Sequence, residues 1–378
     1  MFQMRTPSPA LRAAGAGSVV RRVALGAVAL LTLAAGGSAT ASAADPVQWV
    51  ALGDSYTAGV FVGEPSPALG SADRDGCDRT TGSYPNLVAG MLAAEPPAGR
   101  AVKLTDVSCG GAVIGEIASD RQTPISPVEP PEDGWPSVAT QVERAGLNKD
   151  TDVVTIGVGG NSMSFGTMLS SCLFAGIGQP DEATPCRDAY EAGGPVLDPE
   201  SIYDKYDRVT RQYAGMLRAV HTKAPDARII TVGYPTIFPE DPTSCDRKDT
   251  TELAAAIKGI GTVSVTHGDA AWMHEVTTHL NAIIRALTEL SGDEYVDLAA
   301  TSAGHDACQA PDVKWVEGVC GTAGSYWPTE VALGPITLEC ADGNRATLVH
   351  PNAAGHANAA TQVEAAVRTA LTPVTHRS

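Results

Sequence analysis

The sequence predicts an α/β protein in which about five parallel strands form one sheet with helices on both faces. Two observations lead to this fold class. Short apolar runs alternate with stretches of helical periodicity along the 378 residues, and helix-length connections between strands are typical of parallel sheets. Several apolar runs also end in glycine or serine, as strands do where an open α/β sheet presents its ligands. With 43% hydrophobic and 18% charged residues, the chain can bury a substantial core.

The first residues have the features of a secretory signal. An apolar run at 23–35 is followed by the small residues Ala41-Ser42-Ala43, and four arginines precede the run: Arg5, Arg12, Arg21 and Arg22. The run is too short to span a bilayer comfortably, so we expect residues 1–43 to be removed by cleavage near Ala43. Residues 44–378 then form a single secreted domain. The pair Arg21-Arg22 leaves both the Sec and the twin-arginine export routes open.

The charge of the chain excludes some partners. The formal charge is −17, and residues 1–43 contribute four arginines and no acid. Without them, 22 basic residues face 43 acidic ones, which leaves a formal charge of −21. A surface this acidic argues against nucleic acid as a partner and against capture by anionic membranes.

All eight cysteines lie after the signal segment. In an oxidising compartment an even number indicates disulfides. The shortest loop favours the pair Cys172–Cys186, and we also expect Cys77–Cys109, Cys245–Cys308 and Cys320–Cys340. No Cys-x-x-Cys or paired histidine spacing supports a zinc site.

The first strand is predicted at 47–53. Trp49, Val50 and the two residues after them are apolar, as in a buried strand, and Gly53 allows a sharp turn at its end. Ser55 follows at once. A serine here is either a helix cap or turn residue or a nucleophile, and this stretch alone leaves both open.

The remaining elements follow in order. A loop rich in Gly, Ser, Pro and Asp is expected at 60–83, and a loop rich in Pro and acid at 119–137. The later strands are predicted at 102–107, 152–158, 228–232 and 295–298. The helices are predicted at 84–92, near 138–142, from 203 to the stop at 223–225, and at 269–290 and 352–371. Residues 165–199 have few periodic signals and are expected to form either a flap or an inert surface loop.

Three strand ends carry the chemistry. The first three strands end at Ser55, at Gly110-Gly111 and at Gly159-Gly160-Asn161, which a parallel sheet places along one edge. Backbone N–H groups and an amide beside a serine hydroxyl are what the oxyanion of an acyl transfer needs.

The base should be a histidine. His350 stands before Pro351 and a helix start, so proline can hold the loop that presents its imidazole. His305, which follows the fifth strand, is a rival. Four further histidines lie on or beside predicted helices, where a surface or partly buried role is the default: His221, His267, His274 and His279.

These residues resemble the four sequence blocks of the SGNH (GDSL) hydrolases, and among them the secreted, disulfide-bonded lipases and esterases of actinobacteria. The blocks stand in order: Gly53-Asp54-Ser55, the Gly111 turn, Gly159-Gly160-Asn161, and the stretch from His350 to His356. The resemblance implies a three-layer, flavodoxin-like fold without a metal or cofactor. It implies Ser55 as nucleophile, His350 as base, and an oxyanion hole made by Ser55 N–H, Gly111 N–H and the Asn161 side chain.

One position departs from the pattern. Many members place an aspartate three residues before the histidine, where this chain has Thr347. We expect a Ser–His dyad in which the main-chain carbonyl of Leu348 orients the imidazole. The alternatives are Asp342 and Asp306, although 342–344 has the composition of a turn. Asp54 is expected to be a local hydrogen-bonding residue.

The predicted activity is hydrolysis of a carboxylic ester by a monomeric secreted lipase or esterase, with no stable membrane anchor. An acyltransferase, a carbohydrate deacetylase and an inactive binding protein remain alternatives. Residues 309–348 form a predicted insertion clipped by Cys320–Cys340, and its apolar residues line either an acyl-binding rim or an inert lobe. These residues are Trp315, Tyr326, Trp327, Leu333 and Ile336.

Overall fold

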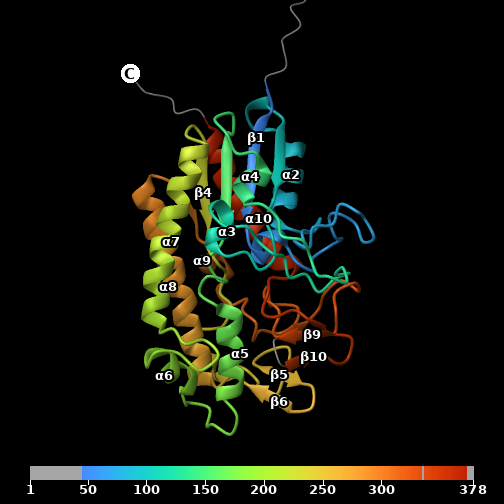
Figure 1. Cartoon of the computed structure of the whole chain (residues 1–378), viewed down its shortest axis with the longest axis vertical. Coiled ribbons are helices and arrows are strands. Elements are labelled where there is room, and N and C mark those ends of the chain that lie inside the picture. Colours follow the sequence, from blue (N-terminus) through green and yellow to red (C-terminus); the bar gives the residue numbers. More distant parts are fainter. Residues whose placement is uncertain (1–44, 334–335, 373–378) are drawn as a thin grey trace, which may run out of the picture. The chain divides into compact units, whose positions relative to one another are not determined.

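A computed structural model describes residues 45–333 and 336–372, so the expected signal segment 1–43 lies outside the described residues. Residues Ala44–Ser378 form one compact unit. Its central sheet has five strands in the order β2-β1-β3-β4-β7, and every neighbouring pair is parallel (Figure 1). The strands are β1 Val47–Gly53, β2 Val102–Asp106, β3 Val153–Gly157, β4 Arg228–Val232 and β7 Glu294–Val296. The predicted α/β class with five parallel strands is confirmed.

The strands are apolar because both faces of the sheet are covered. Successive side chains of a strand point to opposite faces, so Trp49 and Val153 pack into one buried cluster while Val50 and Val154 pack into another. The cluster around Trp49 includes residues of helices α2 (Tyr84–Ala94) and α10 (Ala353–Leu371).

The opposite face carries the two longest helices. These are α7 (Ile202–Lys223) and α8 (His267–Ser291), and they pack on the sheet with the short α3 (Ile114–Ala118) and α4 (Gln141–Ala145). Each long helix begins at a hydroxyl cap, since Ser201 Oγ accepts from Asp204 N–H and Thr266 Oγ1 accepts from Asp269 N–H. Helices on both faces give the three layers that the sequence predicts.

A second sheet is the main feature that the sequence analysis misses. Its four antiparallel strands follow the order β6-β5-β10-β9, and two further strands, β8 and β11, pair with each other. The bounds are β5 Ala254–Ile257, β6 Gly261–Ser264, β8 Cys320–Gly321, β9 Glu330–Leu333, β10 Ile336–Glu339 and β11 Arg345–Ala346. The predicted insertion 309–348 therefore contributes β9 and β10 to this sheet, and the hairpin β5-β6, from an earlier part of the chain, completes it. In Figure 1 this sheet lies at the lower end of the view, away from the start of β1.

Two other expectations need correction. Residues 165–199 contain helices α5 (Phe165–Ala175) and α6 (Pro185–Glu191), because Met168, Leu169 and Cys172 form a buried stripe that a loop would not have. The fifth strand ends at Val296, and Leu298 instead begins α9 (Leu298–Ser302), whose first turn is capped by Asp297 Oδ1.

Four disulfides join Cys77–Cys109, Cys172–Cys186, Cys245–Cys308 and Cys320–Cys340. Each is a pair that the sequence analysis expects. Cys172–Cys186 connects α5 to α6, and Cys77–Cys109 connects the loop after α1 to the turn after β2. The loops around the carboxyl edge of the sheet are thus covalently tied.

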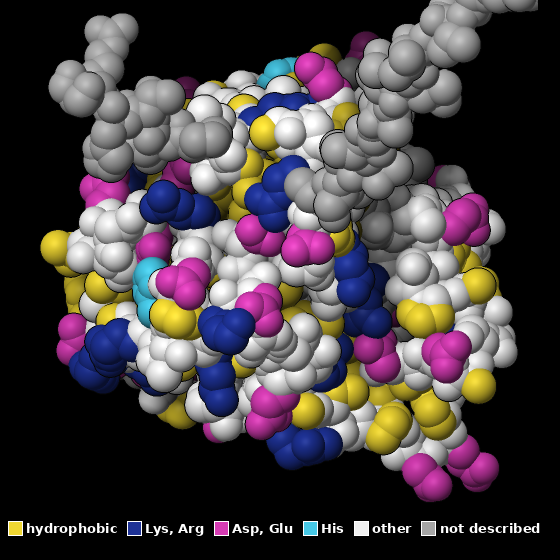
Figure 2. Space-filling model, turned by 90° about the horizontal axis from the view of Figure 1, so that it is seen from above, with side chains coloured by type: hydrophobic (Ala, Val, Ile, Leu, Met, Phe, Trp, Pro, Cys, Tyr) yellow, Lys and Arg dark blue, Asp and Glu magenta, His cyan; other side chains and the backbone are white. Residues whose placement is uncertain are grey.

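The face on which β1 begins carries both signs of charge. Figure 2 shows Lys and Arg side chains interspersed with Asp and Glu side chains there, without a continuous basic area. Among the described residues, no helix is both long enough and apolar enough to cross a membrane.

Candidate active site

Ser55 stands at the carboxyl end of β1, as the first residue of the short helix α1 (Ser55–Ala58). The turn before it requires glycine, because a Cβ on Gly53 would lie 2.2 Å from Thr57 Oγ1 and 2.5 Å from Gly157 O. The absence of a side chain lets the chain turn close against β3 and present Ser55 at the edge of the sheet.

Gln141 fixes the same turn from the side. Its side chain is fully buried, its Oε1 accepts from Gly53 N–H at 2.8 Å, and its Nε2 donates to Gly53 O at 2.7 Å. One amide therefore satisfies both backbone groups of the residue at the end of β1, so the peptide that leads to Ser55 has a single orientation.

The structure brings Ser55 and His350 together. Ser55 Oγ lies 2.7 Å from His350 Nε2. On the other side of the ring, Nδ1 lies 2.9 Å from Thr347 O and 3.0 Å from Leu348 O. A carbonyl oxygen can only accept, so Nδ1 carries the proton and the lone pair of Nε2 faces the serine hydroxyl. Burial lowers the pKa of His350, which favours this neutral form.

Backbone carbonyls orient the imidazole. Leu348 O does so as expected, and Thr347 O shares the role. The Thr347 hydroxyl instead donates to Gly318 O at 3.0 Å. Asp306 accepts from Cys308 N–H at 3.0 Å, and Asp342 has a φ of 55° in a turn. Within the described residues, no carboxylate hydrogen-bonds to His350.

The loop that carries the histidine has an uncommon backbone. Leu348 and Val349 have φ values of 50° and 56°, in the left-handed region that branched side chains rarely adopt. Tyr56 supports this conformation, because its hydroxyl donates to Val349 O at 2.6 Å and its ring packs on His350 with centroids 4.9 Å apart.

Two backbone donors of the predicted site, at Ser55 and Gly111, have no acceptor in the described part of the chain. Gly111 has a φ of 77°, and a Cβ there would meet the Ile125 side chain at 2.8 Å. Glycine is thus needed both for the turn and for the space beside it.

Asn161 is held by the turn after β2. Its Nδ2 donates one hydrogen to Ala112 O at 3.0 Å, which leaves its second hydrogen for a ligand. The next residue is anchored as well, since Ser162 Oγ accepts from Ile114 N–H at 2.9 Å and Arg208 donates to Ser162 O at 2.8 Å. The amide of Asn161 is therefore positioned from both sides.

Asp54 is a buried hydrogen-bonding residue, which agrees with the expectation from the sequence. Its Oδ1 accepts from Tyr56 N–H at 3.0 Å and caps α1, and its Oδ2 accepts from the Tyr234 hydroxyl. Burial raises the pKa of this carboxyl to about 7, although both hydrogen bonds act in the opposite direction.

The other histidines have structural contacts. His305 stacks on Trp315 with centroids 3.7 Å apart, and its Nδ1 faces Val313 O. The four remaining candidates contact, in turn, Asp293, Cys245 O, Phe238 O and the Tyr206 ring: His221, His267, His274 and His279. None of these contacts involves Ser55.

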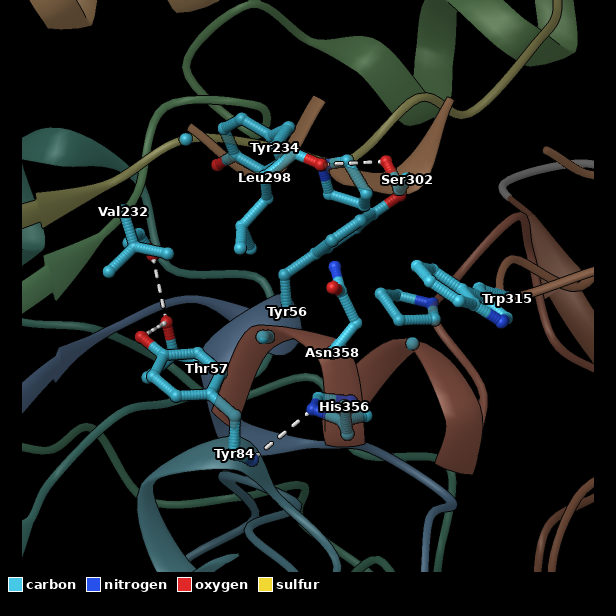
Figure 3. A pocket seen from close by; sticks show the side chains of 16 residues that line it. Tyr56, Thr57, Tyr84, Val232, Tyr234, Leu298, Ser302, Trp315, His356 and Asn358 are labelled. Atoms are coloured by element: carbon cyan, nitrogen blue, oxygen red, sulfur yellow. Dashed lines mark hydrogen bonds between the residues drawn. The ribbon is translucent and has the colours of Figure 1, made fainter. Parts of the chain in front are cut away.

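A small cavity lies beside Tyr56 and His356 (Figure 3). Its volume is about 30 Å³, and it is lined by Tyr56 and Pro351, the neighbours of Ser55 and His350, but not by the pair itself. His356 also lines it, accepts from Tyr84 N–H at 3.2 Å, and has a pKa lowered to about 3 by burial and by the charge of His350. This space has room for one or two waters and is not a substrate cleft.

The insertion 309–348 packs beside the site. Trp327 is only 6% exposed, packs on Phe61 with centroids 5.6 Å apart, and donates to Ala346 O. Phe61 in turn contacts the His350 ring. Trp327 therefore belongs to a buried wall rather than to an exposed rim.

One group of potential metal ligands occurs in the described part of the chain. Atoms of Cys245, Glu252 and Cys308 lie within 4.8 Å of one another. Both sulfurs are joined in a disulfide, so they are not thiolate ligands.

The sequence analysis misses three supporting residues: Tyr56, Gln141 and Tyr234. The sequence could have indicated Tyr56 as a residue of the site, because it directly follows Ser55. Gln141 and Tyr234 have no such signal, since their roles arise only when distant segments meet at the edge of the sheet.

Comparisons with known proteins identify the family of the chain. A sequence model of the GDSL-like lipase/acylhydrolase family matches residues 51–357. Lipase 2 of Streptomyces coelicolor is 33% identical over 317 residues, which cover 82% of this chain and 89% of that protein. An esterase of Streptomyces scabiei is 28% identical over 321 residues, which cover 81% of this chain and 86% of that protein.

Solved structures share the fold. A phospholipase A1 from Streptomyces albidoflavus superposes with a TM-score of 0.52 at 20% identity, over 85% of this chain and 99% of that one. An extracellular lipase from Streptomyces rimosus gives a TM-score of 0.50 at 21% identity, over 86% of this chain and 99% of that one.

Proposed function

The chain belongs to the GDSL-like lipase/acylhydrolase family and is a carboxylic ester hydrolase, and from this premise we propose that Ser55 and His350 catalyse hydrolysis through an acyl-enzyme. The observation that carries the proposal is the 2.7 Å contact between Ser55 Oγ and His350 Nε2, with the imidazole proton held on Nδ1 by two carbonyls. This is the arrangement that a neutral imidazole needs in order to accept the serine proton.

The proposed reaction has two steps. Ser55 Oγ attacks the ester carbonyl while Nε2 takes its proton, and the protonated imidazole then gives this proton to the leaving alcohol. Water attacks the acyl-enzyme in the second step, again with His350 as base, and the acid and Ser55 are released. The carbonyls of Thr347 and Leu348 keep the ring in place while it is charged.

The oxyanion hole has three donors in this proposal: Ser55 N–H, Gly111 N–H and the second hydrogen of Asn161 Nδ2. Its support is that the two backbone groups have no protein acceptor among the described residues and that Ala112 O holds the amide. Donors fixed before the reaction stabilise the developing charge without reorganisation.

We also propose that the enzyme is secreted as a monomer after cleavage near Ala43, and that 44–378 is its single domain. The order of arginines, apolar run and small residues in 1–43 supports export. The four disulfides support an oxidising compartment. Mass spectrometry of the N-terminus of the exported protein tests the cleavage site, and size-exclusion chromatography tests the monomer.

The substrate class that we propose is a lipid or acyl ester, because the wall beside His350 is aromatic and apolar through Phe61 and Trp327. The test is hydrolysis of p-nitrophenyl esters from acetate to palmitate by the mature protein, beside Ser55→Ala. Turnover that disappears in the variant, together with fluorophosphonate labelling of Ser55 alone, supports the mechanism. Equal turnover by folded Ser55→Ala contradicts it.

A further inference from the structure

We propose that Tyr234 is a positioning residue that sets the Asn161 donor relative to Ser55. The inference rests on the proposed function, because it concerns the same oxyanion site. Tyr234 does not touch the reacting atoms. It acts through a hydroxyl placed between the segment of the nucleophile and the segment of the amide donor.

The Tyr234 hydroxyl has one partner on each segment. It donates to Asp54 Oδ2, next to Ser55, and it accepts from Gly160 N–H at 2.7 Å, next to Asn161. These two segments follow different strands, β1 and β3. A single phenol oxygen therefore fixes the distance between the residue before the nucleophile and the residue before the amide donor.

The phenol itself is held rigidly. Asn281 on α8 accepts from Tyr234 N–H at 2.8 Å and donates to Tyr234 O at 2.9 Å, which secures the backbone after β4. The ring is 5% exposed and packs edge-on against Tyr56, with centroids 5.1 Å apart. Figure 3 shows Tyr234 and Tyr56 side by side in the wall of the small cavity.

Loss of the hydroxyl would leave buried groups without partners. Asp54 is 1% exposed, and its Oδ2 has no other hydrogen-bond partner among the described residues. The Gly160 N–H also has no other acceptor there. An unsatisfied buried group favours a rearrangement, and without the phenol the peptide that carries Gly160 N–H is held only through its carbonyl, Gly159 O, which accepts from Met163 N–H. The Asn161 amide would then keep its bond to Ala112 O, but its second hydrogen would no longer point at the oxyanion of the substrate.

The test is a kinetic comparison with a matched control. Tyr234→Phe removes the hydroxyl and keeps the ring. Tyr213→Phe is the control, because Tyr213 is fully buried and its hydroxyl has no hydrogen-bond partner in the described structure. We expect Tyr234→Phe to lower kcat by about 10- to 100-fold and to change KM by less than about twofold. Tyr213→Phe should leave both constants unchanged.

A double-mutant cycle with Asn161→Ala distinguishes positioning from general destabilisation. If Tyr234 acts through the amide, its removal should have almost no further effect on kcat once Asn161 is alanine. Effects that multiply in the double variant, or a Tyr234→Phe enzyme with wild-type kcat, would overturn the inference.

Should Tyr234→Phe not fold, Asp54→Ala interrupts the same connection from the other end, because alanine has no atom that can hydrogen-bond to the phenol. Alanine also removes the side-chain cap of α1, so the melting temperature is measured beside kcat. The same loss of kcat, absent in the Asn161→Ala background, is expected, and an independent effect overturns the proposal. Ser55→Ala is measured alongside, because turnover that survives it would contradict the proposed mechanism, whereas a normal Tyr234→Phe enzyme would contradict only the positioning role.

Discussion

Tyr56 donates its phenolic hydrogen to Val349 O at 2.6 Å. The residue after Ser55 thereby contacts the residue before His350, across 293 positions of the sequence. Val349 and its neighbour Leu348 both have positive φ values, so this hydrogen bond helps to hold a backbone conformation that is unfavourable by itself.

Tyr56→Phe should therefore lower kcat by about 10-fold, because the loop that aims His350 loses its support. The KM and the fold should change little, since the ring still packs on Tyr234 and His350. Steady-state kinetics on a p-nitrophenyl ester measure the effect. Tyr203→Phe, at a side chain that is 61% exposed, is the control, and equal kcat values for the two variants would show that the contact is dispensable.

Asn161→Ala should lower kcat by about 10²- to 10³-fold, the usual loss for one oxyanion donor. The melting temperature should change far less, because the side chain makes one hydrogen bond in the structure, to Ala112 O. Asn358→Ala is the matched control. Asn358 lines the small cavity beside Tyr56 and His356, and its variant should keep full activity. A similar loss in both variants would speak against a specific donor role.

The activity should have an acidic limb set by His350. The base must be neutral, and burial lowers the pKa of its imidazole below the ordinary 6.5. We therefore expect kcat/KM to stay high as the pH falls through 6.5 and then to drop about tenfold per pH unit below the lowered pKa. A pH-stat assay avoids the titration of nitrophenol. An acidic limb centred above 6.5 would contradict the expected direction.

Asp54 should make the stability depend on pH. Its pKa is about 7 in the native state against an ordinary 3.8, so between these values the native state binds the proton more tightly. The stabilisation is complete below the ordinary pKa and is lost as the pH rises through 7.

Asp54→Asn resembles the protonated form and lacks this dependence. Relative to wild type, its free energy of unfolding should rise by roughly 1 kcal/mol per pH unit within that window. Urea denaturation from pH 4 to 8 measures the difference. A constant difference across that range would contradict the raised pKa.

The sequence predicts the central sheet well, because each strand carries its own signal. Buried parallel strands are continuous apolar runs, and a glycine turn such as that at Gly53 marks where they end. In the structure β1 pairs with both β2 and β3, so it lies between them in the sheet. The positions of Ser55, Gly111 and Asn161 follow from motifs at these ends, and that of His350 follows from the motif before the last predicted helix.

The second sheet could not be predicted in the same way. Its strands are four residues long, and β5 pairs with β10 through Ile257 and Leu338. No local pattern in either segment identifies such a partner. The role of Gln141 could not be predicted for the same reason, because it depends on the hydrogen bonds that its amide makes to Gly53 in the folded chain.

Ser55 and His350 lie 295 positions apart, although their side chains touch. During synthesis Ser55 leaves the ribosome early, and His350 follows 295 residues later. Domains fold as units, and α10, which packs on the sheet, is made only after the His350 loop. A chain that stops before His350 therefore lacks both a helix that covers the sheet and the proposed base, and we expect it neither to complete the fold nor to cleave an ester.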